Sequence, residues 1–150
     1  MNRFDRVREI CGGWGLYESS DEQTQLLYAV SEAGELAKSI AKKDREAARD
    51  DIGDILVCII NAYELSDRKN KLEDHVDFEA NHHGTLLAFS DLLNDLGGAI
   101  LQGGGYLSVC DNLATISGNL MLTIDECIDQ AISEIEKRKG KIVNGVFCKE

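Results

Sequence analysis

The chain lacks proline, is poor in aromatic residues and contains no long apolar run. None of its 150 residues is proline, and Phe, Trp and Tyr together make up 6% of them. Proline removes a backbone donor and breaks helices, so its absence suits a mostly helical chain. No run of about 18 apolar residues occurs, and we expect no membrane-spanning helix. The first residues also lack the apolar stretch of a signal peptide.

Positive charge and closely spaced cysteines are scarce as well. The net charge of −11 argues against a nucleic-acid partner, because a phosphate backbone is bound through clustered Lys and Arg. It does not argue against a phosphorylated small molecule, for which a bound metal ion can supply positive charge. The five cysteines are odd in number, lie far apart and include no Cys-x-x-Cys pair. We therefore expect reduced thiols and a cytoplasmic protein.

Apolar residues recur at helical spacing through most of the chain. This pattern predicts five helices, at about residues 21–43, 45–65, 85–101, 106–122 and 123–139. Asp44 is expected to cap the second helix, and a Thr123–Glu126 capping box to open the fifth, which Gly140 would end. Residues 66–84 are expected to be a loop with one helical turn, and the tail from residue 141 to be extended. We predict a single all-α domain, a bundle of about five helices.

Two acidic pairs with the same internal pattern say most about function. Glu32-Ala-Gly-Glu35 and Asp51-Ile-Gly-Asp54 begin 19 residues apart on the first two predicted helices. Residues i and i+3 share a helix face, and the turn between the helices brings the pairs roughly level. Gly34 and Gly53 are expected to let these two helices approach closely. Four carboxylates facing one another repel unless a cation lies between them, and oxygen ligands favour Mg²⁺. A solvated acidic face is the alternative.

Several segments resemble MazG-like nucleoside triphosphate pyrophosphohydrolases, all-α enzymes with a Glu-x-x-Glu … Glu-x-x-Asp signature, and in particular their small bacteriophage-type members. The resemblance covers about residues 14–65 and 123–150 and leaves 66–122 as a helical insertion. It implies hydrolysis of an NTP or dNTP to the monophosphate and pyrophosphate with Mg²⁺ or Mn²⁺. It also implies a homodimer or homotetramer in the cytoplasm of a bacterium or a phage-infected host cell. The segments are Trp14-Gly15-Leu16-Tyr17, Gln25-Leu26, Ser31-Glu32-Ala33-Gly34-Glu35-Leu36-Ala37, Asp51-Ile52-Gly53-Asp54-Ile55-Leu56-Val57 and Arg138-Lys139-Gly140-Lys141.

The resemblance and the charges together suggest a role for each residue. The metal ligands are expected to be Glu32, Glu35, Asp51 and Asp54, and Glu35, which has the reach, is our first choice of general base. Basic residues near the C-terminus could also merely offset a helix dipole, Asn61 could be a helix-packing hydrogen bond, and Trp14 could belong to the core or to a subunit interface. The candidate substrate-binding residues are Arg138, Lys139, Lys141, Lys38, Asn61 and Trp14.

Some positions depart from the family pattern and leave a second function open. Asp51 stands where the family has Glu, Tyr28 replaces a common lysine, and Ser133-Glu134 replaces an Asn and a Lys that bind phosphates in many members. A catalytically weakened nucleotide-binding, regulatory or adaptor protein is therefore the alternative. A di-iron protein would need a second Glu-x-x-His motif beside Glu79-Ala-Asn-His82. Gly103-Gly104-Gly105 lacks the lysine and the preceding strand of a phosphate loop.

Overall fold

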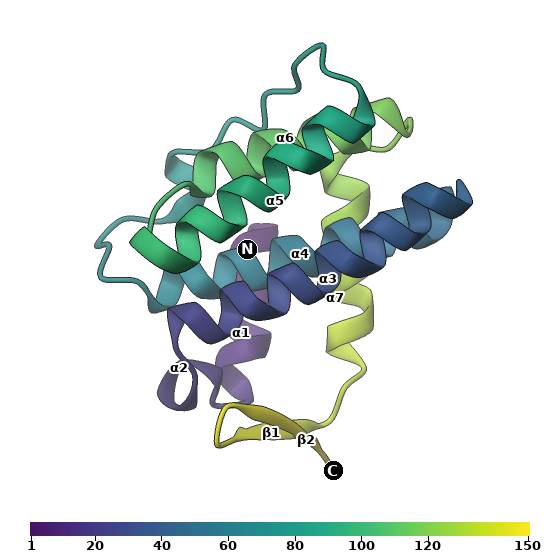
Figure 1. The fold of residues 1–150 in the computed structure, drawn as a ribbon. Coiled ribbons are helices and arrows are strands. Elements are labelled where there is room, and N and C mark those ends of the chain that lie inside the picture. Colours follow the sequence, from purple (N-terminus) through teal and green to yellow (C-terminus); the bar gives the residue numbers. More distant parts are fainter.

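The computed structural model describes all 150 residues and is built almost entirely of helices (Figure 1). The prediction of an all-α protein is confirmed, with two short N-terminal helices in addition to the five expected. No helix is both long enough and apolar enough to cross a membrane. The elements are α1 (Arg3–Gly13), α2 (Leu16–Ser19), α3 (Glu22–Lys42), α4 (Arg45–Leu65), the 3-10 turn η1 (Leu72–Asp74), α5 (Thr85–Gln102), α6 (Tyr106–Asn119), α7 (Ile124–Glu136), β1 (Gly140–Val143) and β2 (Val146–Lys149).

Helices α3 and α4 form an antiparallel hairpin through the centre of the molecule. The carboxylate of Asp21 accepts a hydrogen bond from the backbone N–H of Thr24 at the start of α3. Asp44 caps α4 in the same way, as expected, by accepting from the N–H of Ala47. Between the helices Lys43 adopts a φ of 55°, which reverses the chain within two residues. These local signals fix where each helix begins, and therefore which residues lie opposite one another.

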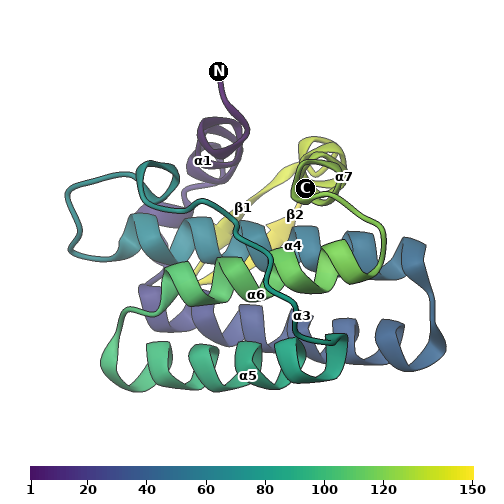
Figure 2. The same ribbon diagram turned by 90° about the horizontal axis from the view of Figure 1, so that it is seen from above.

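Helices α5 and α6 lie along the α3–α4 hairpin and complete a four-helix arrangement (Figure 2). Helix α5 packs on α3, and α6 packs on α4. Leu92 and Leu96 of α5 and Leu113 and Ile116 of α6 are fully buried in the shared core. Burial of each such side chain stabilises the fold by about 1.5–3 kcal/mol. Residues 66–122, expected to be a helical insertion, thus supply two helices of the bundle.

Helices α1 and α7 pack on α4, and this contact corrects one prediction. A Cβ added at Gly53 would lie 2.2 Å from the carbonyl oxygen of Cys127 in α7, so this glycine lets α7 approach α4. A Cβ at Gly34 would meet nothing within 4 Å. The expectation that both glycines serve the contact between α3 and α4 is therefore wrong. The face of α4 that carries Gly53 is covered by α7.

The C-terminal tail folds into a β-hairpin that returns to the N-terminal helices. Strand β1 pairs antiparallel with β2 through the Asn144-Gly145 turn, in which both residues have positive φ, the signature of a tight hairpin turn. The N–H of Ile142 donates to the carbonyl oxygen of Trp14, 2.7 Å away, and ties the hairpin to the segment between α1 and α2. Helix α7 ends at Glu136, before Gly140, which belongs to β1.

Candidate active site

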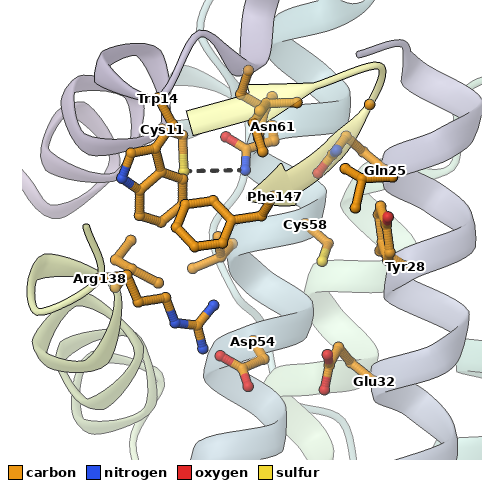
Figure 3. A pocket seen from close by; sticks show the side chains of 16 residues that line it. Cys11, Trp14, Gln25, Tyr28, Glu32, Asp54, Cys58, Asn61, Arg138 and Phe147 are labelled. Carbon is orange, nitrogen blue, oxygen red and sulfur yellow. Dashed lines mark hydrogen bonds between the residues drawn. The ribbon is translucent and has the colours of Figure 1, made fainter. Parts of the chain in front are cut away.

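A cavity of about 380 Å³ opens between α3, α4, the end of α7 and the β-hairpin. Figure 3 shows the carboxylates of Glu32 and Asp54 at one end of it, with the guanidinium of Arg138 beside Asp54. Trp14 and Phe147 lie at the other end, and their ring centroids are 4.8 Å apart. The cavity is therefore charged at one end and aromatic at the other.

The two carboxylates in the cavity come one from each acidic pair. Burial raises the pKa of Asp54 to about 7, and the negative charges of Asp50 and Glu32 add to this, while Arg138 opposes it. The pKa of Glu32 is raised by burial first and then by the charges of Asp51 and Glu35. Since burial and like charges both disfavour the ionised form, a cation bound here would be favoured. The level placement of the pairs brings Glu32 and Asp54 together as predicted.

Glu35 and Asp51 lie beside the cavity and not in its lining. The side chain of Glu35 is 55% exposed, and its carboxylate accepts a hydrogen bond from Nζ of Lys38, 3.0 Å away. The carboxylate of Asp51 accepts from the hydroxyl of Ser39 on α3. Burial still raises the pKa of Asp51, and the charge of Glu35 contributes to this rise. All four predicted acids therefore share one electrostatic environment, although two of them already have partners within the protein.

A fifth acid, Asp50, was missed by the sequence analysis. Its Oδ1 atom is buried and has no hydrogen-bond partner. Its charge raises the pKa values of Glu32, Asp51 and Asp54. The signal was present in the sequence, because Asp50 lies four residues before Asp54 and so on the same side of α4.

The chemistry of this cluster suits a hard divalent cation. All of its ligand atoms would be carboxylate oxygens, the donors that Mg²⁺ prefers. The buried, unpartnered Oδ1 of Asp50 is an acceptor that no group of the protein satisfies. As the side chains stand, no three acidic, His or Cys groups are arranged to hold a metal ion. Binding of an ion would therefore require side-chain rotations that turn these carboxylates toward one point.

The candidate substrate-binding residues divide into two sets. Arg138, Trp14 and Asn61 line the cavity. The amide of Asn61 is engaged within the protein, because its oxygen accepts from the hydroxyl of Tyr17 at 2.7 Å and its nitrogen donates to the sulfur of Cys11 at 3.4 Å. Outside the lining are Lys38, which pairs with Glu35, and the exposed Lys139 and Lys141.

Two further lining residues were not among the candidates. Phe147 reaches the cavity only because the tail folds back as a hairpin. Gln25 is buried in the lining, where its amide nitrogen donates to the hydroxyl of Ser20. Helical spacing could have indicated Gln25, which lies seven residues before Glu32 on the same face of α3. No comparable signal joined Phe147 to the acids.

Comparison with known families agrees with this arrangement. Residues 20–80 match the family model described as the MazG nucleotide pyrophosphohydrolase domain. This segment is similar to the MazG domain. It contains α3 and α4 entirely, and with them both acidic pairs. The resemblance to MazG-like enzymes is thus confirmed over these residues, and the match indicates nucleotide pyrophosphohydrolase activity in general. No curated protein and no solved structure matches the chain.

Proposed function

We propose that the protein hydrolyses a nucleoside or deoxynucleoside triphosphate to the monophosphate and pyrophosphate with the help of Mg²⁺. One observation carries this proposal: the cavity has Glu32, Asp54 and Arg138 at one end and two aromatic rings at the other. A metal-bound nucleotide has the same polarity, with charged phosphates at one end and a flat base at the other. The acids at the charged end lie in the segment that is similar to the MazG domain.

The charged end would hold the triphosphate. Glu32 and Asp54 would bind Mg²⁺ directly, and Glu35 and Asp51 are the other proposed ligands. The bound ion would supply neutralisation of the phosphate oxygens and a lower pKa for a bound water. Arg138 would donate to phosphate oxygens, since its planar guanidinium suits paired contacts with them. Lys139 and Lys141 would add positive charge at the mouth of the cavity.

Glu35 is the proposed general base. Its carboxylate lies outside the cavity lining and is paired with Lys38. It would therefore not be occupied fully by the metal ion that Glu32 and Asp54 bind. A carboxylate of this kind can accept the proton of the attacking water once the substrate is in place. Its pairing with Lys38 on an exposed helix face contributes only about 0.3–0.5 kcal/mol, so the side chain is free to change partners.

The aromatic end would hold the base. Trp14 and Phe147 form a tilted pair with an interplanar angle of 58°, and both residues line the cavity. Aromatic contacts of this kind contribute about 0.5–1.5 kcal/mol beyond the area they bury. Ile142 and Val146 of the hairpin extend this wall with apolar surface. Binding of a base between the hairpin and α4 would orient the phosphates toward Asp54.

Assembly as a homodimer or homotetramer is also proposed. Large apolar side chains are exposed on neighbouring helices, among them Leu27 of α3 (58%) and Leu86 and Leu101 of α5 (78% and 84%). A second copy that covers this face would remove them from water. Light scattering on the purified protein measures the assembly directly.

The function is tested by measuring pyrophosphate release. The purified protein is incubated with each of the common NTPs and dNTPs in Mg²⁺, Mn²⁺ or EDTA. We expect turnover of at least one nucleotide that requires the divalent cation and is lost in Glu32→Gln. Binding of a metal-nucleotide complex without release of pyrophosphate from any substrate would instead support the nucleotide-binding or regulatory alternative.

A further inference from the structure

We propose that Asp50 is a direct ligand of the divalent cation, together with Glu32 and Asp54. This inference rests on the proposed function and extends it, because Asp50 lies outside the two acidic pairs that identified the site. Two features carry it: an acceptor atom without a partner, and the contrast with the acids that already have partners.

Oδ1 of Asp50 is shielded from solvent and accepts no hydrogen bond. A buried polar atom left in this way destabilises the folded protein, and more so when the group is charged. The adjacent Arg49 does not compensate it, because Nε of Arg49 is also buried without a partner and its Nη2 donates to Glu46. No basic side chain of the protein therefore neutralises this oxygen. A bound cation is the group that would.

Asp51 and Glu35 differ from Asp50 in this respect. The hydroxyl of Ser39 donates to Asp51, and the ammonium of Lys38 donates to Glu35. Each of these two acids would give up an existing bond, or share it, to become a metal ligand. Asp50 would give up none. Among the acids that do not line the cavity, Asp50 is therefore the one that could bind the ion without losing a hydrogen bond.

The position of Asp50 on α4 brings it to the acids of the cavity. It precedes Asp54 by four residues, so the two side chains are neighbours on one helix face. Asp51 is turned by about 100° from Asp50, as consecutive helical residues are, and it reaches Ser39 of α3. Side-chain rotations that turn Asp50, Asp54 and Glu32 toward one point would let them share one ion.

Binding of Mn²⁺ alone tests this assignment without any turnover. Free Mn²⁺ is measured by electron paramagnetic resonance during titration of the full chain, and the melting temperature is recorded with and without the ion. We expect Asp50→Asn to weaken Mn²⁺ binding at least tenfold and to remove most of the rise in melting temperature that Mn²⁺ produces. Asp51→Asn should weaken binding less.

Asp95→Asn is the matched control. Asp95 is also a partly buried aspartate with a raised pKa, on α5, where Nδ2 of Asn112 donates to it. This variant should bind Mn²⁺ as the wild type does. Circular dichroism establishes that each variant is folded, and we expect Asp50→Asn to be at least as stable as the wild type without metal, because it removes a buried charge.

Each outcome decides the assignment. Unchanged Mn²⁺ affinity in Asp50→Asn, a larger loss in Asp51→Asn, or no Mn²⁺ binding by the wild type would overturn it. A wild type that binds Mn²⁺ through Asp50 but releases pyrophosphate from no nucleotide would leave the ligand assignment standing and refute the proposed function. Nucleotide turnover by Asp50→Asn with unchanged Mn²⁺ affinity would refute the ligand assignment and leave the proposed function standing.

Discussion

Two clusters of charged residues involve side chains of α4, one around Arg8 of α1 and one around Asp54. The guanidinium of Arg8 on α1 contacts the carboxylates of Asp5, Glu64 and Glu73, and only 12% of the Arg8 side chain is exposed. This pairing lowers the pKa of Glu73. Around Asp54, like charges gather, and burial raises its pKa to about 7. Each carboxylate of the first cluster contacts a basic side chain, whereas Glu32, Asp50 and Asp54 form no ion pair.

This difference separates a cluster that joins elements of the fold from the cluster that we propose as the active site. Opposite charges around Arg8 join α1, α4 and η1, so the cluster holds distant segments together. The like charges around Asp54 oppose folding at neutral pH, and Arg138 is the cation that acts against them at Asp54. Perturbed ionisable groups in a cavity are typical of functional sites, although ion-pair networks perturb pKa values too. The direction of the pKa shift distinguishes the two clusters here: the pKa of Glu73 is lowered and that of Asp54 is raised.

The largest expected effect concerns the acids of the site. Asp54→Asn should lower kcat by roughly 10²–10³-fold, the scale of losing one group that stabilises developing charge, and should also weaken Mn²⁺ binding. Glu35→Gln should lower turnover comparably but leave binding of the Mg²⁺-nucleotide complex measurable by calorimetry. Loss of nucleotide binding with intact turnover in Glu35→Gln would contradict its role as general base.

The second effect concerns the stability that the Arg8 cluster supplies. Arg8→Ala should lower the free energy of unfolding by about 3 kcal/mol, because it leaves the partly buried carboxylate of Glu73 without its partner. Urea denaturation measures this, and pyrophosphate release by the folded protein should be unaffected. Arg6→Ala is the matched control on the same helix: its ion pairs with Glu9 and Glu136 are exposed, and its removal should cost at most about 1 kcal/mol. An equal decrease in the free energy of unfolding in both variants would show that the Arg8 cluster is no more stabilising than an exposed ion pair.

The third effect is a pH dependence of opposite sign in the two clusters. The folded pKa of Asp54 is raised, so its unfavourable contribution to stability develops as the pH rises from about 4 to about 7. The folded pKa of Glu73 is lowered, so its favourable contribution is present above its unfolded value and is lost in acid. In EDTA, Asp54→Asn should therefore be more stable than the wild type at pH 8, by about 1 kcal/mol after solvent screening.

The same pair of proteins should have nearly equal stability at pH 3, where Asp54 is protonated in the folded protein and largely so in the unfolded chain. Urea denaturation at the two pH values gives the difference, and the subtraction removes the titration of all other groups. Addition of Mg²⁺ at pH 8 should stabilise the wild type and not Asp54→Asn. A variant less stable than the wild type at both pH values would show that Asp54 supports the fold.

The smallest effect concerns the uncharged end of the cavity. Phe147→Ala should raise KM for the nucleotide about 2- to 10-fold with little change in kcat, since it removes an aromatic wall from the proposed base site. Val143→Ala, in the same hairpin but outside the cavity lining, should leave KM unchanged. A fall in kcat with constant KM would place the role of Phe147 elsewhere.

Local sequence signals predicted most of the helices and half of the acidic site. Asp44 and the Thr123–Glu126 capping box begin α4 and α7 as expected, because capping depends on residues within one helical turn. The spacing of the acidic pairs placed Glu32 opposite Asp54, since both lie on adjacent helices joined by a short turn. Trp14 and Arg138 line the cavity, whereas Lys139 and Lys141 do not.

Other features depended on contacts between segments far apart in the chain. Gly53 faces α7 and not α3, which no spacing within α3 and α4 could reveal. Phe147 lines the cavity because a backbone hydrogen bond from Ile142 to Trp14 holds the β-hairpin against the N-terminal helices. The spacing from Asp54 could have indicated Asp50, but the burial of its unpartnered Oδ1 atom depends on the elements packed around it.

The amino-acid sequence alone determined the helical class, the ends of the central helices and the two acidic pairs, because turns, caps and helical periodicity act over a few residues. The tertiary structure decided which of those acids meet, which lose their water, and which remain bound to neighbours such as Ser39 and Lys38. Solvent exclusion and the sum of nearby charges are properties of the packed molecule. They distinguish a candidate metal site from acidic residues on an exposed helix face.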